Sequence, residues 1–155
     1  MELISYSYEF QASLEKFLEI TLSYTGYKFD PTGLHSDIRN IEKIYQSPGG
    51  NFWIMIENGA VIGSIALKIL NKIDKIGEIK RYFVLPLYQG KGIGTLLMEH
   101  LLLNAQKNEL NILRLDTMRK STAARKIFEK YEFQEINKYN ANEVAEIFME
   151  LKLKK

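Results

Sequence analysis

Apolar and polar residues alternate along the chain in patterns that predict a helical N-terminal part and a strand-rich remainder. Two segments, 13–24 and 30–46, repeat apolar residues every three or four positions, as a helix with one buried face requires. Ser47-Pro48-Gly49-Gly50 then ends the second helix. The residues on these faces are Leu14, Phe17, Leu18 and Thr21 in the first segment and Leu34, Ile38, Ile41, Ile44 and Tyr45 in the second.

Downstream, short runs rich in β-branched and aromatic residues alternate with helical patterns. Asn58-Gly59 predicts a hairpin turn between two strands. A polar loop over 71–77 leads to a third strand. This order predicts one α/β domain over residues 1–155 with a mixed sheet. The predicted strands cover 52–57, 61–70, 78–84, 112–116, 133–136 and 147–153, and the later helices cover 95–108 and 121–131.

The composition is that of an ordinary globular domain and excludes several classes of protein. Of 155 residues, 46% are apolar, and a net charge of +2 is too small to favour nucleic acid or an acidic membrane as partner. The absence of cysteine excludes disulfides, cysteine-ligated zinc and a cysteine nucleophile. Without a signal-peptide pattern or a membrane-spanning apolar run, we expect a cytoplasmic protein. His35 and His100 lack a second ligand at metal-binding spacing, so we expect no metal.

The most informative motif is a glycine-rich turn, Gln89-Gly90-Lys91-Gly92-Ile93-Gly94-Thr95, between a predicted strand and a predicted helix. Glycines permit a tight turn and leave the backbone N–H groups uncovered. At a helix N-terminus, where the backbone carries partial positive charge, such N–H groups bind phosphate or pyrophosphate. The segment therefore predicts a phosphate-binding turn.

Three other interpretations compete with this one. A P-loop would need Lys and then Ser or Thr after the last glycine, whereas Thr95-Leu96 follows Gly94. A dinucleotide site would need Gly-x-Gly-x-x-Gly in the first strand–helix unit, although Asp116 does lie where a ribose-binding acid would be expected. A turn that only joins strand to helix does not explain three glycines, each of which lowers stability by about 0.5–1 kcal/mol in a regular element.

Gln89-Gly90-Lys91-Gly92-Ile93-Gly94 resembles the Gln/Arg-x-x-Gly-x-Gly/Ala signature of the GNAT family of N-acetyltransferases, which bind the pyrophosphate of acetyl-CoA. The resemblance covers residues 50–153 in the right order, and the sequence is similar to the small bacterial-type branch of the family. It implies a single-domain fold with a mixed, mostly antiparallel sheet, one splayed pair of parallel strands, and flanking helices. The further stretches that carry it are Val84-Leu85-Pro86, Leu113–Thr117, Ala124–Phe133, Tyr139-Asn140, Asn142 and Phe148–Leu151.

The resemblance also implies acetyl-CoA as co-substrate, with its pantetheine arm between the strands 78–84 and 112–116. The main chain of Phe83 and Val84 would bind the pantetheine and the thioester carbonyl, and the amides of the glycine turn would hold the pyrophosphate. The implied cofactor-binding residues are Phe83, Val84, Gln89, Gly90, Lys91, Gly92, Ile93, Gly94, Thr95, Ser121, Ala124 and Phe128.

Glu78 falls where histone-acetylating members of the family carry their general base, so the resemblance implies that role here. Strict alternation would place Glu78, Lys80, Tyr82 and Val84 on one strand face, and such a polar face indicates a cleft. Since a substrate ammonium has a pKa near ~10.4, its deprotonation at neutral pH costs roughly 4–5 kcal/mol, which a base helps to offset. An ion pair of Glu78 with Lys80 or Arg81 is the alternative.

One departure from the family pattern concerns the acid that protonates the leaving thiolate. Phe128 stands where many members carry a tyrosine for this step. Tyr131, roughly on the same helical side, is the substitute we expect, with core packing as the alternative. We expect direct attack by a primary amine, either a small molecule or a peptide, with homodimerisation left open. A module that binds acyl-CoA without turnover is the alternative function.

Overall fold

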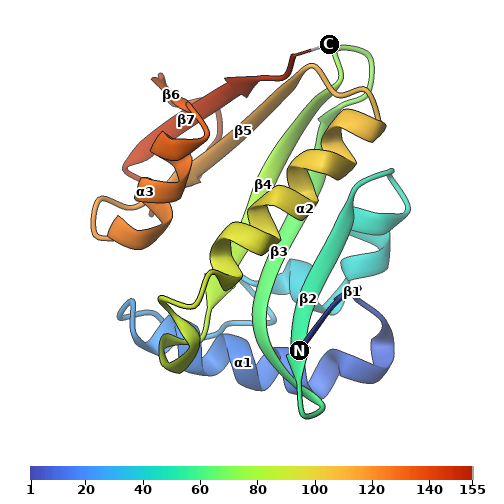
Figure 1. Ribbon diagram of the computed structural model, residues 1–155, viewed down its shortest axis with the longest axis vertical. Helices are drawn as coiled ribbons and strands as arrows, with labels where there is room; N and C mark the ends of the chain where they lie inside the picture. Colours follow the sequence, from blue (N-terminus) through green and yellow to red (C-terminus); the bar gives the residue numbers. More distant parts are fainter. Residues whose placement is uncertain (155) are drawn as a thin grey trace.

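The computed structural model describes residues 1–154, which form one seven-stranded sheet flanked by helices (Figure 1). The strand order is β1-β2-β3-β4-β5-β7-β6, and only β4 and β5 pair in parallel. The predicted fold class is thus confirmed. No helix among the described residues is long and apolar enough to cross a membrane. The elements are β1 (Glu2–Ser5), α1 (Gln11–Ser23), β2 (Asn51–Glu57), β3 (Ala60–Asn71), β4 (Ile76–Val84), α2 (Ile93–Lys107), β5 (Ile112–Thr117), α3 (Thr122–Lys130), β6 (Gln134–Ile136) and β7 (Ile147–Lys152).

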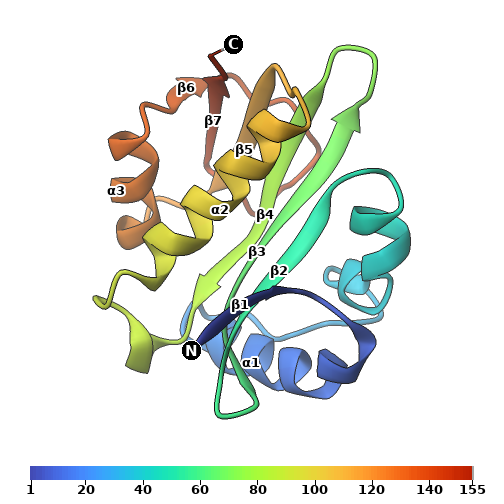
Figure 2. The same cartoon turned by 45° about the vertical axis from the view of Figure 1, so that its right-hand side comes forward.

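The sheet separates two apolar clusters, with α2 and α3 on one side of the strands and α1 on the other (Figure 2). Neighbouring residues of β3 divide between them: Ile65 belongs to the cluster under α2, and Ala66 to the cluster under α1. This division follows from the alternation of side chains along a strand. Leu97, Leu101 and Phe128 are buried on the α2 side, and Leu14, Phe17 and Leu18 on the α1 side.

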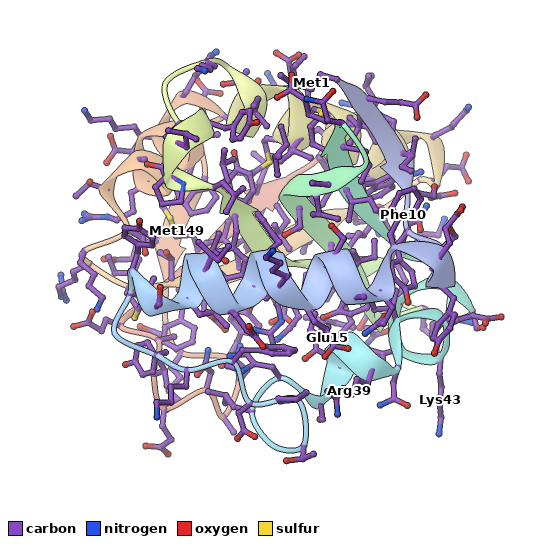
Figure 3. The ribbon with its side chains drawn as sticks, turned by 90° about the horizontal axis from the view of Figure 1, so that it is seen from below. Met1, Phe10, Glu15, Arg39, Lys43 and Met149 are labelled. Atoms are coloured by element: carbon purple, nitrogen blue, oxygen red, sulfur yellow. The ribbon has the colours of Figure 1, made fainter. Side chains whose placement is uncertain are left out.

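The predicted helix over 30–46 is wrong as a continuous element. The chain forms a 3-10 turn (Ser36–Arg39) and then a wide π-type turn (Glu42–Gln46). Arg39 ties this region to α1 through a 2.9 Å ion pair with Glu15 (Figure 3). The residues predicted to be apolar anchors, such as Ile38, are nevertheless buried, because a spacing of three to four residues suits each kind of turn.

Several element boundaries also differ from the prediction. The sequence analysis missed β1, since four residues give too short an alternation to be noticed. β4 begins at Ile76 instead of 78, and α2 begins at Ile93 instead of 95. Phe133 precedes β6 and is not part of it.

A β-bulge reverses the faces of β4 near its end. Ser64 pairs with Phe83 and Ala66 with Lys80, so one residue of β3 lies opposite two of β4. Arg81, in the bulge, has a φ of 51°, which is rare for a residue other than glycine. The buried Ser64 Oγ donates a 2.7 Å hydrogen bond to the Arg81 carbonyl oxygen. This contact satisfies a carbonyl group at the irregularity in the strand pairing.

The bulge corrects the predicted alternation. Beyond it, Tyr82 and Val84 pack with the cluster under α2, as Ile79 does, while Phe83 packs with the cluster under α1. Glu78, the neighbour of Ile79, therefore lies on the face opposite to Tyr82 and Val84.

β4 and β5 diverge after a short parallel ladder, as Figure 1 shows. The ladder runs from Ile76 opposite Ile112 to Ile79 opposite Leu115, and no later residues of the two strands are paired within residues 1–154. The remainder of β4 therefore has an open edge toward β5.

Candidate active site

A cleft of about 1190 Å³ follows the divergence of β4 and β5. We call one part the turn end, formed by Val84 and the segment 89–95. We call the other part the carboxylate end, formed by Glu78, Asp116 and Asn140 together with Lys68 and Lys80. Both ends line the same cleft.

The turn end exposes backbone N–H groups. Gly90 and Gly92 adopt φ values of 78° and 81°, which glycine takes without steric cost. Within the described chain, no hydrogen bond engages the N–H groups of Gly90, Lys91 or Gly92. α2 begins at Ile93, so its first N–H groups also lack intrahelical partners. The six N–H groups of residues 90–95 at this helix N-terminus can therefore bind an anion.

Gly94 has a different role from the other two glycines. A Cβ at Gly94 would lie 3.1 Å from the Tyr82 hydroxyl and 3.2 Å from Ile127 Cδ1. Tyr82 donates a 2.5 Å hydrogen bond to the Gly94 carbonyl oxygen. Gly94 thus permits close packing of α2 against β4 and α3.

Val84 turns its backbone toward the open edge of β4. Leu85 N–H donates to Ile62 O at 2.9 Å, which makes the pair of Val84 and Gly63 one without direct hydrogen bonds. The N–H and carbonyl groups of Val84 therefore point away from β3. The Gln89 side chain donates to the Val84 carbonyl oxygen at 3.2 Å. By the same register, Phe83 directs its backbone toward β3.

At the carboxylate end, Glu78 is 4% exposed and its carboxylate has an asymmetric environment. Oε2 accepts hydrogen bonds from the Tyr139 hydroxyl at 2.6 Å and from Asn140 Nδ2 at 3.2 Å. Within residues 1–154 the Lys80 ammonium is the one charged partner of Oε1, at 3.9 Å, which is too long for a hydrogen bond. Burial, and then the hydrogen bond to the Glu78 carboxylate, raise the pKa of Tyr139, so its phenol stays protonated.

Asp116 is held beside Glu78 by the loop between β6 and β7. Asn140 Nδ2 donates to Asp116 Oδ2 at 2.7 Å, and Asn142 Nδ2 donates to Oδ1 at 3.1 Å. Asn140 thus bridges Asp116 and Glu78. The role of Asp116 as the ribose acid of a dinucleotide site does not fit these contacts, nor does such a site fit a mostly antiparallel sheet.

The residues predicted on α3 divide between the cleft and the surface. Ser121, Ala124 and Phe128 line the cleft. Tyr131 does not line it, and its hydroxyl donates to Glu99 of α2 at 3.0 Å. This placement corrects the expectation that Tyr131 reaches a leaving group in the cleft.

Of the two ion pairs predicted as the alternative role of Glu78, the one with Lys80 is present at 3.9 Å, whereas Arg81 pairs with Asp37 and not with Glu78. Arg81 donates to both carboxylate oxygens of Asp37, at 2.7 and 2.9 Å, and Tyr45 donates to Asp37 at 2.5 Å. Although burial opposes it, these bonds lower the pKa of the Asp37 carboxyl below its usual range. The pair fastens the 3-10 turn to the bulge of β4.

His35 lies at the edge of the cleft as a neutral acceptor. Its Nδ1 accepts a hydrogen bond from Asp30 N–H at 2.8 Å, and its ring stacks on Phe29 at 5.7 Å. Burial, and then the charge of Arg81, lower the pKa of His35. Among the described residues, no group of three or more His, Asp or Glu side chains could hold a metal ion.

Sequence reasoning from the residues alone missed the contacts that organise the carboxylate end. Tyr139, Asn140 and Asn142 were noticed only through the family resemblance, without a role. A run of polar residues in a loop of no regular pattern was the available signal. Asp37 gave no signal, because its partner Arg81 is 44 residues away.

The parallel strands β4 and β5 diverge, and backbone N–H groups without hydrogen-bond partners within residues 1–154 lie at one end of the cleft that follows this divergence. This arrangement is characteristic of the acetyltransferase class of fold. Residues 14–133 match the family model of the acetyltransferase (GNAT) family. The protein therefore belongs to the acetyltransferase (GNAT) family.

Individual relatives agree with this assignment. An acetyltransferase of the GNAT family from Staphylococcus aureus Mu50 has a TM-score of 0.89 and 25% identity, with 99% of both chains covered. PaiA N-acetyltransferase from Thermoplasma acidophilum, solved in complex with coenzyme A, shares the fold with a TM-score of 0.74 at 21% identity, with 98% of both chains covered. N-acetylaspartate synthetase from Xenopus tropicalis is 33% identical over 104 residues, which are 66% of this chain and 38% of that protein. The chain thus spans well under two thirds of that relative's length.

Proposed function

We propose that the protein is an N-acetyltransferase that transfers an acetyl group from acetyl-CoA to a primary amine by direct attack. The observation that carries this proposal is the opening of unengaged amides and a buried carboxylate onto one cleft. Acetyl-CoA supplies an activated acetyl thioester. The protein then has to position the amine, take up its proton and exclude water.

The turn end fits the pyrophosphate of acetyl-CoA. The N–H groups of Gly90 to Gly92 and of the first turn of α2 provide donors without requiring any particular side chain. A Cβ at Gly90 or Gly92 would meet no atom within 4 Å, so both glycines border open space. Lys91 lies over the Tyr88 ring at 5.3 Å and adds a positive charge beside the turn.

The open edge of β4 fits the arm that joins pyrophosphate to thioester. The Val84 N–H, directed away from β3, is available to donate to the thioester carbonyl oxygen. A backbone donor that is already fixed in a strand needs no reorganisation during the reaction. The backbone groups of Phe83 face β3, so Phe83 can support this edge only by its place next to Val84 and by packing in the cluster under α1.

Glu78 is the proposed general base through its Oε1 atom. Oε2 is occupied by Tyr139 and Asn140, so the carboxylate is held in one orientation. Oε1 has no hydrogen-bond donor within residues 1–154 and can accept a proton from the amine, directly or through a water.

The thiolate can leave without a dedicated acid. A reference thiol has a pKa of about 8.5, so the free thiolate is a competent leaving group near neutral pH. Tyr131 lies outside the cleft and Phe128 has no proton to donate. These two facts favour one second candidate function, binding of acyl-CoA without turnover.

The test is titration of acetyl-CoA by calorimetry, followed by measurement of CoA release with a thiol reagent. The amine panel contains L-aspartate, because the Xenopus relative's name states N-acetylaspartate as its product, and also propylamine, spermidine and a short peptide. In Glu78→Gln, turnover should fall about 100-fold or more with acetyl-CoA affinity unchanged. Glu143→Gln, on the exposed part of the same loop as Asn140, is the matched control.

Binding of acetyl-CoA with no CoA release for any amine would support the second candidate. Failure to bind acetyl-CoA would overturn both. Equal losses of affinity and turnover in Glu78→Gln would show that Glu78 has only a structural role.

A further inference from the structure

The carboxylate end contains a row of alternating charges across the sheet. Lys68 of β3, Glu78 of β4 and Arg114 of β5 are register partners, and Glu150 of β7 follows Arg114. Register partners on neighbouring strands share one face. Lys80, two residues after Glu78 and before the bulge, lies on that face too.

Two basic groups that line the cleft, Arg114 and Arg81, are already neutralised. Arg114 Nε lies 3.1 Å from Glu150 Oε2, and Arg81 holds Asp37 at 2.7 Å. In each pair the two charges neutralise each other, so neither pair has a net charge with which to bind a ligand.

Two further cations, Lys68 and Lys80, are held less firmly: Lys80 lies at the limit of ion-pair distance from Glu78, 3.9 Å from its Oε1. Neither ammonium makes a hydrogen bond within the described part of the chain, and the nearest carboxylate oxygen to Lys80 is 3.9 Å away. The Lys80 side chain is only 30% exposed. Since no hydrogen bond engages this ammonium within residues 1–154, it can donate hydrogen bonds to an anionic ligand in the cleft.

Two carboxylates, Glu78 and Asp116, line the same cleft as these lysines. Glu78 and Asp116 accept hydrogen bonds from Tyr139, Asn140 and Asn142, all of which are neutral donors. Because none of these donors carries a charge, none of them forms an ion pair with the two carboxylates. The carboxylate end is therefore nearly neutral in sum but divided into a positive and a negative part.

We infer that the acceptor is a small amine that also carries an anionic group, as an amino acid does. Its amine meets Glu78 and Asp116, and its anionic group meets Lys68 and Lys80. This inference rests on the proposed acetyltransferase function and adds the class of acceptor. Because its two charged groups meet side chains of opposite sign, a zwitterion is held in one orientation, with its amine next to the proton acceptor Glu78.

The same field disfavours amines that are only cationic. A polyamine or a lysine side chain could use the two carboxylates but would leave the two lysines without a counter-ion and would be repelled by them. A neutral amide of an amino acid has the right size but leaves the lysines unpaired.

The test compares matched amines by kcat/KM for CoA release. L-alanine, L-aspartate and β-alanine supply a carboxylate, and 2-aminoethyl phosphate supplies a phosphate. L-alaninamide, propylamine and spermidine supply no anion. We expect the best anionic amine to exceed every other class by about tenfold or more, since only an anionic group makes charge-assisted hydrogen bonds to the two lysines. The two anionic classes distinguish a carboxylate from a phosphate.

The comparison with L-alaninamide is demanding for a chemical reason. An amine beside an amide group has a pKa of about 7.7–8.0, as at a peptide N-terminus. More of it is unprotonated at neutral pH, so chemistry alone favours the amide over the amino acid. A preference for the amino acid therefore reports recognition of its anionic group.

Variants locate that recognition. Lys80→Met and Lys68→Met keep the apolar stem and remove the charge. Each should raise KM for the preferred anionic amine about tenfold relative to its effect on KM for L-alaninamide, so that the preference for the anionic amine falls. Lys80→Arg should retain most of the preference. Lys72→Met, in the exposed loop after β3 and outside the cleft, is the control.

The failure of this inference and that of the proposed function are distinguishable. If amines are acetylated but spermidine or the amide is preferred, the inference is overturned and the acetyltransferase function stands. If the two methionine variants change all amines alike, the lysines do not recognise the acceptor and the inference is also overturned. If acetyl-CoA binds and no amine of any class reacts, the proposed function itself has failed.

Discussion

The two ends of the cleft are built in different ways. The turn end is one continuous stretch of main chain, from Val84 to Thr95, in which glycine φ angles and a helix N-terminus do the work. The carboxylate end is assembled from side chains of β3, β4, β5 and the β6–β7 loop, with the 3-10 turn fastened beside it.

This difference separates two tasks. A main-chain site binds a group common to many donors and depends on few side-chain identities. A side-chain site can be varied residue by residue and suits a specific acceptor. If the division holds, changes at one end should leave the function of the other end nearly intact.

The largest expected effect is at Arg81, where the bulge meets the 3-10 turn. Arg81→Met leaves the Asp37 carboxylate largely buried without its cation, so we expect unfolding free energy to fall by about 3 kcal/mol in urea denaturation. Arg81→Met with Asp37→Leu should recover part of this loss, because no lone charge remains. If Arg81→Met were as stable as the wild type, the ion pair of Arg81 with Asp37 would not be what holds the 3-10 turn against β4.

The next effect concerns the turn end alone. Gly92→Val forces a β-branched residue into a left-handed φ, so the amides lose their arrangement. We expect acetyl-CoA affinity in calorimetry to fall about 100-fold, which corresponds to about 2.7 kcal/mol.

Gly59→Val is the matched control for this change. Gly59 has a φ of 77° and open space around it, but it lies in the hairpin between β2 and β3. It should show a similar loss of stability and normal acetyl-CoA affinity. Equal losses of affinity in both variants would mean that Gly92 acts only through folding.

A smaller effect is expected at the other end from Asn140→Ala. This change removes the donor that Glu78 and Asp116 share, so the base is held less firmly. We expect kcat to fall about tenfold while acetyl-CoA affinity stays constant. Asn108→Ala, at the end of α2, is the control. A change confined to acetyl-CoA affinity would break the proposed division of the cleft.

The smallest effect is the pH dependence contributed by His35. Because its pKa is lowered in the folded protein, the unfolded chain binds the proton more readily, and stability is lost as pH falls below about 6.5. In His35→Asn, thermal unfolding between pH 7.5 and 5.5 should show a shallower decline than in the wild type. The exposed His100→Asn is the control, and an unchanged slope in His35→Asn would refute the assignment.

The turn end was predictable from sequence because its determinants are local. Three alternating glycines between a strand and a helix pattern specify a turn within seven residues. Most strands and helices could be predicted for the same reason, since their periodicity is read within one segment.

The carboxylate end was predictable only in part. Glu78 was identified through the family resemblance, but Tyr82 and Val84 were wrongly predicted to share its face of β4. The bulge that separates them could not be foreseen, because the residue with the positive φ is Arg81 and not a glycine. The bonds from Asn140 to Glu78 and Asp116 span 62 and 24 residues. Nothing in a local pattern encodes such contacts, which arise from strand register and loop packing.

The bridge made by Asn140 has a consequence for redesign of this enzyme. The loop that carries Tyr139 and Asn140 lines the cleft and at the same time fixes the orientation of the Glu78 carboxylate. Exchanging this loop for one from another acetyltransferase would therefore change proton uptake together with specificity. A library that holds Tyr139, Asn140 and Asn142 constant and randomises the exposed positions between Asn142 and β7 would alter the two properties separately.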